Sequence, residues 1–211
     1  MIKKIFIYGS SGHFREQLDW LKESVKIQKN FEIEGIIDDL RKDEDYDSYS
    51  KLKIYSSKSI SLSKNIFIFI AVGDIKIRKK CTNEFKHFNF YNLIHPSSII
   101  SENSVLGKGV CIAPYTLING NVRIGDFNNF NSHSLVSHDC IIGENNFFSS
   151  FSILMGNCKI GDDNFIGTNA TLLPSVQIEN NNLIGAHSLV KENFGSNLKV
   201  FGTPAKIKVT E

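Results

Sequence analysis

ISENSVLGKGVCIAPYTLINGNVRI, residues 100–124, carries a large apolar residue at every sixth position. The same spacing continues without a miss to position 190. Its members are Ile100, Leu106, Ile112, Ile118, Ile124, Phe130, Val136, Ile142, Phe148, Leu154, Ile160, Ile166, Leu172, Ile178, Ile184 and Val190. A period of six fits neither a helix nor simple strand alternation, but it is typical of a parallel β-helix, in which each short strand sends one large side chain inward and then turns a corner. We therefore predict an all-β parallel β-helix in residues 96–211.

Three hexapeptides make one coil, so residues eighteen apart are predicted to stack on one another. Four glycines have this spacing and are expected at one corner, where the backbone turns tightly or approaches another backbone: Gly107, Gly125, Gly143 and Gly161. Cys140 and Cys158 are also eighteen apart, which is close enough in principle for a disulfide. In a reducing compartment we expect both to remain packed thiols, and no CxxC spacing suggests zinc.

Residues 1–95 show no six-residue period and favour alternating strands and helices. The predicted strands are residues 4–8, 31–37, 66–72 and 88–93, and the predicted helices are residues 14–24 and 75–85. Strands separated by helical connections indicate a short parallel sheet, so we predict an α/β, Rossmann-like domain ahead of the β-helix. Residues 41–64 are polar and loop-like, and residues 201–206 are expected to form a loop that leaves the end of the β-helix.

Composition excludes several classes of protein. The chain has 211 residues, of which 41% are apolar, and this is enough for a proper core. Its formal net charge of +2, with lysines scattered among acids, does not favour nucleic acid as a partner. The apolar stretches are too short to cross a bilayer, and the charged start leads into a strand, unlike a signal peptide. We expect a cytoplasmic protein with no membrane partner.

A glycine-rich turn follows the first predicted strand. It consists of Gly9, Ser10, Ser11, Gly12 and His13. Such a turn places backbone N–H groups and a helix N-terminus at the carboxyl edge of a parallel sheet, where these sheets bind ligands. Asp38 and Asp39 end the second strand and Gly73 follows the third, so they are predicted at the same edge. The turn lacks the full GxGxxG pattern, and solvated strand ends and steric glycine turns are common alternatives.

His138 interrupts the β-helix pattern just after Val136, at a corner where a side chain points outward. Attack of an amine or a hydroxyl on a thioester requires removal of a proton, which an imidazole with a pKa of about 6.5 can perform near neutral pH. Asp139 lies beside it and could fix the tautomer and support the imidazolium, as in hydrolytic triads. The alternative is a merely solvated polar corner, since the equivalent positions one coil away are Gly120 and Gly156.

A second histidine leaves a metal site open as an alternative. The spacing of His133 and His138 is that of zinc-binding β-helix hydratases similar to the gamma class of carbonic anhydrase. Those enzymes use a third histidine two coils earlier, where this chain has Ser97, and only His95 is near. Catalytic zinc needs three protein ligands and water, so no metal is predicted.

These residues together resemble the hexapeptide-repeat acyltransferases of the sialic acid O-acetyltransferase and bacillosamine-pathway N-acetyltransferase type. The resemblance covers nearly the whole chain. It is carried by Gly9-Ser10-Ser11-Gly12-His13, Asp38-Asp39, His95-Pro96, the repeats, Ser137-His138-Asp139-Cys140 and Gly202-Thr203-Pro204-Ala205-Lys206. It implies a left-handed β-helix, a homotrimer with active sites between subunits, acetyl-CoA as donor, and a nucleotide sugar bound by the N-terminal domain.

The resemblance also suggests roles for individual residues. The catalytic residues would be His138 and Asp139. The acetyl-CoA contacts would come from Asn131, Gly156, Gly167, Gly185, Ala186 and, toward phosphate, Lys206. The nucleotide sugar would meet the glycine turn, Asp38, Asp39 and Gly73. Close relatives often have a second histidine nine residues after the catalytic one, where this chain has Phe147.

The expected function is therefore acetyl-CoA-dependent N-acetylation of a nucleotide-linked amino-deoxy sugar for surface-glycan biosynthesis. Three alternatives remain open at this point. The acceptor could be a sugar hydroxyl, as in sialic acid O-acetylation, because the same residues serve both. The zinc hydratase is disfavoured by Ser97. A silent binding or assembly protein is disfavoured by His138, Asp139 and the C-terminal tail. Outward apolar residues such as Phe147 and Phe151 are expected to need covering by neighbouring subunits.

Overall fold

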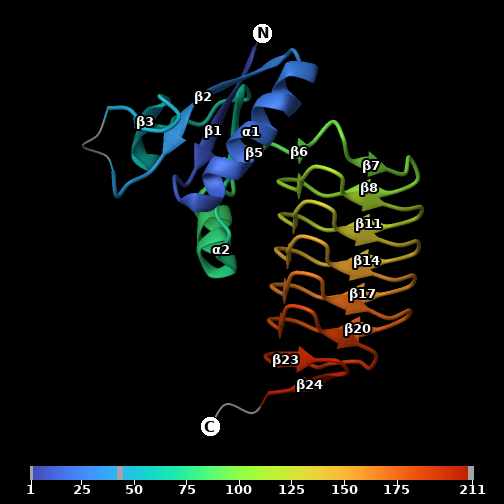
Figure 1. The fold of residues 1–211 in the computed structure, drawn as a ribbon. Helices are drawn as coiled ribbons and strands as arrows, with labels where there is room; N and C mark the ends of the chain where they lie inside the picture. Colours follow the sequence, from blue (N-terminus) through green and yellow to red (C-terminus); the bar gives the residue numbers. More distant parts are fainter. Residues whose placement is uncertain (1, 42–44, 209–211) are drawn as a thin grey trace. The chain divides into compact units, whose positions relative to one another are not determined.

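The computed structural model describes residues 2–41 and 45–208. It divides into two compact units, Met1–Pro96 and Ser97–Glu211. The first unit mixes strands with helices and the second consists of stacked coils, which run from green to red in Figure 1. Neither helix in the described part of the chain has the length and apolar character needed to cross a bilayer.

The first unit is a five-stranded parallel sheet with the strand order β3-β2-β1-β4-β5 and two helices. The strands are β1 (Lys3–Tyr8), β2 (Phe31–Ile37), β3 (Lys53–Tyr55), β4 (Ile66–Ile70) and β5 (Asn89–Phe90), followed by β6 (Leu93–Ile94); the helices are α1 (Gly12–Ile27) and α2 (Ile75–Glu84). The chain leaves β1 for β2 on one side and later adds β4 on the other. This reversal makes the carboxyl ends of β1 and β4 the switch point of the sheet, where α/β folds form their binding crevice.

The structure corrects the prediction that residues 41–64 are loop-like, of which residues 42–44 lie outside the described residues. Residues 53–55 pair in parallel with β2 as the edge strand β3, and a short 3-10 helix, η1 (Ser57–Ser59), follows. Asp47 organises the approach to β3: its carboxylate accepts hydrogen bonds from the Ser50 N–H at 2.7 Å and from Arg41 at 2.8 Å. These bonds hold the pKa of Asp47 at about 2 although burial alone would raise it. Local side-chain bonds of this kind leave no hydrophobic period in the sequence.

The second unit is a parallel β-helix, as the six-residue period predicts. Each hexapeptide contributes a two-residue strand, and residues eighteen apart pair in register, for example Leu117 with Leu135. The strands are β7 (Ile99–Ile100), β8 (Val105–Leu106), β9 (Cys111–Ile112), β10 (Leu117–Ile118), β11 (Arg123–Ile124), β12 (Asn129–Phe130), β13 (Leu135–Val136), β14 (Ile141–Ile142), β15 (Phe147–Phe148), β16 (Ile153–Leu154), β17 (Lys159–Ile160), β18 (Phe165–Ile166), β19 (Thr171–Leu172), β20 (Gln177–Ile178), β21 (Leu183–Ile184) and β22 (Leu189–Val190). They form three faces: β7-β10-β13-β16-β19-β22, β8-β11-β14-β17-β20, and a third running from β9 through β12, β15, β18 and β21.

The periodic apolar residues fill the interior of the β-helix. Phe130 and Phe148 are fully buried, and their rings stack at 4.5 Å between centroids. Ile100 and Leu106, in the first coil, are only partly buried. Because each coil repeats the same inward position, burial of this column supplies most of the hydrophobic stabilisation of the unit.

A column of buried asparagines runs along one interior corner. It contains Asn128, Asn146, Asn164 and Asn182. The Asn146 amide donates to Asn128 Oδ1 at 3.0 Å and to the Gly161 carbonyl at 2.8 Å, and its own Oδ1 accepts from the Asn164 N–H at 2.9 Å. Successive coils are thus tied together through buried side chains that are hydrogen-bonded to one another, and only at the last asparagine, Asn182, does the amide nitrogen lack a partner among the described residues. This ladder fixes the eighteen-residue register, since a slipped coil would leave buried polar groups unpaired.

The corners use a backbone geometry that the apolar period does not reveal. At every sixth residue a non-glycine side chain has a left-handed φ, for example 59° at Asn121, 60° at Asp139 and 64° at Asn157. Asparagine and aspartate tolerate this conformation better than most residues. Gly125, one of the predicted corner glycines, has no left-handed φ, and a Cβ there would lie 2.6 Å from the Gly143 carbonyl oxygen. That column is therefore required for close backbone approach and not for a turn.

The C-terminal segment corrects a second prediction. Residues 201–206 do not leave the β-helix as a loop. They belong to a hairpin of β23 (Lys199–Gly202) and β24 (Ala205–Ile207), and β23 adds in parallel to β21. Val200 and Ala205 are buried in the core, so the hairpin closes the last coil.

The asparagine ladder generates the first prediction. Asn146→Ala removes one rung and leaves the Gly161 carbonyl and the Asn164 N–H without partners, so the free energy of unfolding should fall by about 2–4 kcal/mol. The matched control is Asn181→Ala, because Asn181 is exposed and its amide bonds only the Asn197 side chain among the residues described. Its loss should be about 1 kcal/mol or less in the same denaturation experiment. Equal losses would mean that the ladder does not fix the register.

Candidate active site

His138 and Asp139 lie together on the corner that follows β13. His138 Nδ1 lies 2.7 Å from Asp139 Oδ2, which is hydrogen-bond distance. The His138 side chain is 64% exposed, so its ring is open to an incoming molecule. The predicted neighbours therefore do interact, and the interaction leaves the other ring nitrogen, Nε2, available.

Asn121, one coil earlier on the same corner, holds the other oxygen of the carboxylate. Its Nδ2 donates to Asp139 Oδ1 at 2.6 Å. The hydrogen bond from Asn121, and then that from His138, lower the pKa of Asp139 from its usual 3.8. Sequence reasoning missed Asn121. The available signal was its position eighteen residues before Asp139, which places the two residues in one column.

The hydrogen-bond order assigns the histidine tautomer. An ionised carboxylate only accepts hydrogen bonds, so the proton in the His138–Asp139 bond resides on Nδ1. A neutral His138 ring then carries its lone pair on Nε2. This is the arrangement in which an aspartate orients a histidine that acts as a base.

Gly156, one coil later, provides the space for the imidazole. A Cβ atom at Gly156 would lie 2.7 Å from His138 Cε1 and 2.8 Å from Nε2, closer than real contacts allow. The equivalent glycine one coil before His138, Gly120, has no such constraint, because a Cβ there would meet only Ser101 Oγ, at 3.7 Å. The lone-pair nitrogen thus lies against the backbone of Gly156, whose N–H donates no hydrogen bond within the described part of the chain.

The other residues expected to contact acetyl-CoA lie on a different corner, after β12, β18 and β21. Gly167 and Gly185 donate their N–H groups to Ile184 and Val200 carbonyls, both at 2.8 Å. Of the backbone N–H and C=O groups expected to contact pantetheine, the N–H groups of these two glycines are therefore already used between coils. Both glycines also have a packing reason: a Cβ at Gly167 would lie 2.5 Å from the Ala186 nitrogen, and one at Gly185 would overlap the Phe201 ring.

Two hydrogen-bond donors at that corner are still available. Asn131 Oδ1 accepts from Asn129 Nδ2 at 2.9 Å, which turns the Asn131 Nδ2 away from this bond. That amide and the Ala186 N–H donate no hydrogen bond among residues 2–41 and 45–208. Asn131 and Ala186 are therefore the better candidates for contacts to an amide-bearing chain such as pantetheine.

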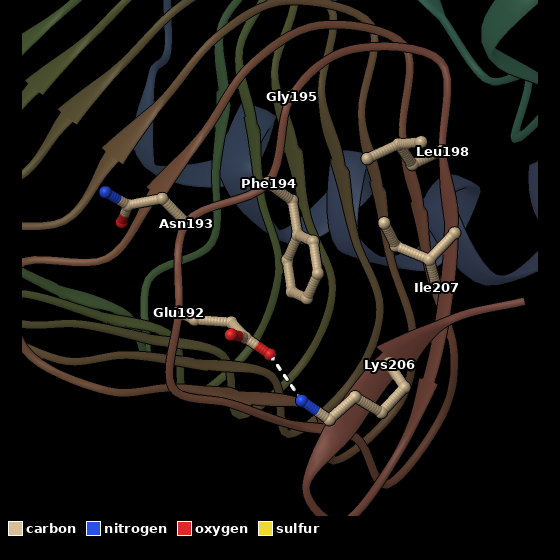
Figure 2. Close-up of a pocket in the computed structure, with 7 residues that line it drawn as sticks. All are labelled: Glu192, Asn193, Phe194, Gly195, Leu198, Lys206 and Ile207. Atoms are coloured by element: carbon tan, nitrogen blue, oxygen red, sulfur yellow. Dashed lines mark hydrogen bonds and ion pairs between the residues drawn. The ribbon is translucent and has the colours of Figure 1, made fainter.

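Lys206 lies at the mouth of a pocket of about 440 Å³ at the C-terminal end of the β-helix (Figure 2). Its Nζ forms an ion pair with Glu192 Oε1 at 2.8 Å, and its side chain is 66% exposed. Figure 2 shows this pair with the Phe194 ring beside it. A phosphate at Lys206 would have to compete with Glu192, whose pKa the lysine lowers by hydrogen bonding and by charge.

The residues expected to bind the nucleotide sugar do gather at the switch point of the sheet. Gly9 ends β1 with a φ of 101°, and a Cβ there would lie 2.7 Å from Val72, beyond β4 and next to Gly73. Ser10 Oγ donates to Asp38 Oδ2, so the turn is tied to the end of β2. Ser11 is the N-cap of α1 without a side-chain cap bond, and Gly12 and His13 begin that helix. His13 Nδ1 lies 3.7 Å from Glu16.

Asp39 forms hydrogen bonds within the protein at that edge. Its Oδ1 accepts from Ser56 Oγ at 2.8 Å and from the Ser57 N–H at 2.9 Å, which ties β2 to η1. Although burial acts in the opposite direction, the bonds from Ser57 and Ser56 lower the pKa of Asp39. Asp38 accepts from Ser10 and, at 3.0 Å, from the Leu40 N–H. Since a carboxylate has about four acceptor positions, both acids keep positions for a ligand.

The remaining sequence candidates have other surroundings. The exposed His133 ring lies between Tyr115 and Phe151: it stacks on Phe151 at 4.6 Å between centroids and is tilted by 33° to the Tyr115 ring at 5.0 Å. Within the described ranges there is no group of three or more His, Cys, Asp or Glu residues that could hold a metal ion. Phe151 is 47% exposed, whereas Phe147 is 6% exposed and stacks on Phe165, so the expectation that Phe147 needs covering was wrong.

The stacked cysteines are both thiols. Cys140 and Cys158 are free and fully buried. Their sulfur atoms approach the Met155 and Leu173 carbonyl oxygens, each at 3.3 Å. The hydrogen bond from Cys140, together with burial, raises the pKa of Cys158. The pair therefore fills the interior of the corner whose outer surface carries His138.

The sequence is similar to two protein families and to a curated protein. Residues 4–85 match the PglD N-terminal domain family, and residues 157–192 match the bacterial transferase hexapeptide family. The chain is 25% identical over 117 residues to UDP-N-acetylbacillosamine N-acetyltransferase from Bacillus subtilis (strain 168); this match covers 53% of the chain and 51% of the relative. The aligned region thus spans about half the length of that curated relative.

Solved structures match over the full length. PerB from Caulobacter crescentus, crystallised with CoA and GDP-perosamine, has a TM-score of 0.84 and 26% identity, with 99% of each chain covered. The acetyltransferase domain of PglB from Neisseria gonorrhoeae FA1090 has a TM-score of 0.86 and 23% identity over 98% of this chain and 100% of that one, and supports the fold alone.

The strand topology and the match to PerB together give a left-handed parallel β-helix that follows an α/β N-terminal domain, which confirms the predicted fold class. The chain thus combines a segment similar to the PglD N-terminal domain with hexapeptide repeats, and over its full length it is similar to PerB.

The second prediction concerns the space beside Gly156 that the His138 ring occupies. Gly156→Ala should displace the imidazole and break the Nδ1 to Asp139 bond, because the new methyl group occupies ring space. Gly120→Ala is the matched control on the same corner, and neither glycine has a left-handed φ that alanine would strain. Crystal structures of the two variants measure the effect. An unmoved ring in Gly156→Ala would show that Gly156 does not position His138.

Proposed function

We propose that this protein transfers an acetyl group from acetyl-CoA to the amino group of a nucleotide-linked amino-deoxy sugar, as a step in surface-glycan biosynthesis. The observation that carries the proposal is the His138–Asp139 pair at 2.7 Å, with Nε2 exposed beside Gly156. The chain that carries this pair shares 26% sequence identity over 99% of its length with PerB, a protein crystallised with CoA and GDP-perosamine.

His138 acts as the general base. Its Nε2 takes the proton that the acceptor nitrogen loses as the new C–N bond forms, and Asp139 stabilises the resulting imidazolium through Nδ1–H. The thioester of acetyl-CoA supplies the electrophilic carbonyl carbon. The unengaged N–H of Gly156 donates to the carbonyl oxygen as negative charge develops there, which lowers the barrier. The sulfur leaves as a thiolate with the electron pair of the broken C–S bond, and the proton held by His138 converts it to the free thiol.

Asn131 and Ala186 bind the donor. The Asn131 Nδ2 and the Ala186 N–H are the donors that this corner leaves unused, and pantetheine carries amide carbonyl groups that accept such bonds. Gly167 and Gly185 contribute by having no side chain, because a Cβ at either position would collide with Ala186 or Phe201. Lys206 meets phosphate by exchanging its partner Glu192 for the more highly charged anion.

The N-terminal unit binds the nucleotide portion of the acceptor. Its glycine turn brings backbone N–H groups and the start of α1 to the switch point, which suits phosphate. Asp38 and Asp39 offer carboxylate oxygens to hydroxyl or base N–H donors. This assigns acceptor recognition and donor recognition to separate parts of the chain.

The active protein is a homotrimer, with each active site built between neighbouring subunits. Within one chain, His138 lies on a different corner from Asn131 and Ala186, so a partner subunit is needed to bring the two sets together. Large apolar side chains also remain exposed on the single β-helix, among them Ile99 at 68%, Val105 at 63% and Ile141 at 49%. Light scattering should give the mass of three copies, and a monomer at micromolar concentration would contradict this arrangement.

An O-acetyltransferase acting on a sugar hydroxyl needs the same base and the same donor site. The amine is favoured because the Bacillus subtilis relative is named as an N-acetyltransferase and PerB was crystallised with an amino sugar. The acceptor experiment is release of free thiol from acetyl-CoA in the presence of UDP-, dTDP- and GDP-linked amino sugars, sialic acid, and the free amino sugars. A nucleotide-linked amino sugar should be the best acceptor, and activity only with sialic acid would favour the hydroxyl.

The catalytic prediction uses the acceptor that this panel selects. His138→Ala should lower kcat by about 10²–10⁴, which is the usual contribution of a general base, and leave the affinity for acetyl-CoA nearly unchanged. His133→Ala is the control, because β13 separates His133 from His138 and the His133 ring stacks on Phe151. A decrease below threefold in His138→Ala, or an equal decrease in the control, would assign catalysis to another residue.

A further inference from the structure

The catalytic corner contains a third polar side chain that the proposed mechanism does not yet use. Asn121, Asp139 and His138 form a continuous hydrogen-bonded chain, with contacts of 2.6 Å and 2.7 Å. Asn121 Nδ2 bonds one carboxylate oxygen and His138 Nδ1 bonds the other. The carboxylate is therefore held at both oxygens and has little freedom to rotate.

The β-helix itself produces this alignment. Asn121 and Asp139 occupy the same corner position in successive coils, with left-handed φ angles of 59° and 60°. Identical backbone conformations in register direct the two side chains alike, one above the other. Asparagine tolerates the left-handed conformation and, unlike aspartate, also brings an N–H donor to the carboxylate above it.

We propose that Asn121 is a positioning residue for the acetyl transfer: by occupying Asp139 Oδ1, it directs Oδ2 to His138 Nδ1 and keeps the lone pair on Nε2. This inference rests on the proposed function. Asn121 bonds the carboxylate of Asp139 and not the imidazole, so in this proposal its effect on His138 passes through Asp139. The lowered pKa of Asp139, whose first cause is the Asn121 hydrogen bond, agrees with this role because the carboxylate stays ionised.

A merely structural role for Asn121 makes a different prediction. In that case the residue would serve only to tolerate the left-handed corner, as other asparagines in the β-helix do. Asn181 provides the comparison: its φ is 56°, and its Nδ2 donates to the stacked Asn197 Oδ1 at 2.7 Å, on a corner away from His138. Asn181→Ala thus loses the same kind of bond at the same backbone conformation.

The test compares Asn121→Ala, Asn121→Asp and Asn181→Ala by steady-state kinetics at pH 8. Asn121→Ala should lower kcat about three- to tenfold with little change in either KM. Asn121→Asp should be worse, because it keeps the size and corner tolerance but replaces the donor by a charge that repels Asp139. Asn181→Ala should retain the wild-type kcat. If aspartate is milder than alanine at position 121, the residue serves the backbone only and the proposal is overturned.

Two spectroscopic readouts separate positioning from folding. The pKa of the Asp139 carboxyl, followed by its carbon NMR signal, should rise toward 3.8 in Asn121→Ala and stay lowered in Asn181→Ala. Nitrogen NMR should show the Nδ1–H tautomer of His138 in the wild type and a mixture in Asn121→Ala. An unchanged tautomer and carboxyl pKa would overturn the proposal. If His138→Ala itself retains activity, the proposed function fails, whereas loss in His138→Ala with full activity in both Asn121 variants rejects only the role of Asn121.

Discussion

Exact stacking of eighteen-residue coils is the constraint on which the rest of this structure depends. The inward apolar column supplies the driving force, but burial alone would tolerate small shifts between coils. The buried asparagines do not, because the Asn146 and Asn164 amides each bond the carboxamide of the coil before and a backbone carbonyl of a neighbouring corner. A slip would leave several buried polar groups unpaired, at a cost far above that of an altered apolar contact.

The candidate active site is a consequence of that register. Asn121, His138 with Asp139, and Gly156 come from three successive coils of one corner, and each meets the next because their backbones repeat. The preceding coil supplies the hydrogen-bond donor Asn121, and the following coil supplies, at Gly156, the space that the imidazole occupies. A side chain at Gly156 or a missing amide at position 121 would disturb the same imidazole from opposite sides. General-base chemistry is thereby placed on a rigid scaffold instead of a mobile loop.

The six-residue period was sufficient to predict the β-helix, because every coil repeats one large inward residue. It also located His138 and Asp139, as adjacent residues that depart from the apolar pattern. Asn121 was missed because its role depends on the left-handed corner conformation, which aligns side chains eighteen residues apart. The engagement of the Gly167 and Gly185 N–H groups in the ladder between coils could not be predicted for a related reason, because it depends on the same stacking of residues eighteen apart. The edge strand β3 and the C-terminal hairpin were missed because polar side chains and short pairings stabilise them.

The central claim is that this corner removes a proton from an amine so that an acetyl group is transferred to nitrogen. The most direct measurement is NMR of the product after incubation of the protein with acetyl-CoA and the preferred nucleotide-linked amino sugar. We predict a new amide, with the acetyl group on the sugar nitrogen, formed by the wild type and not by His138→Ala. An ester on a sugar hydroxyl, or an amide formed equally well without His138, would contradict it.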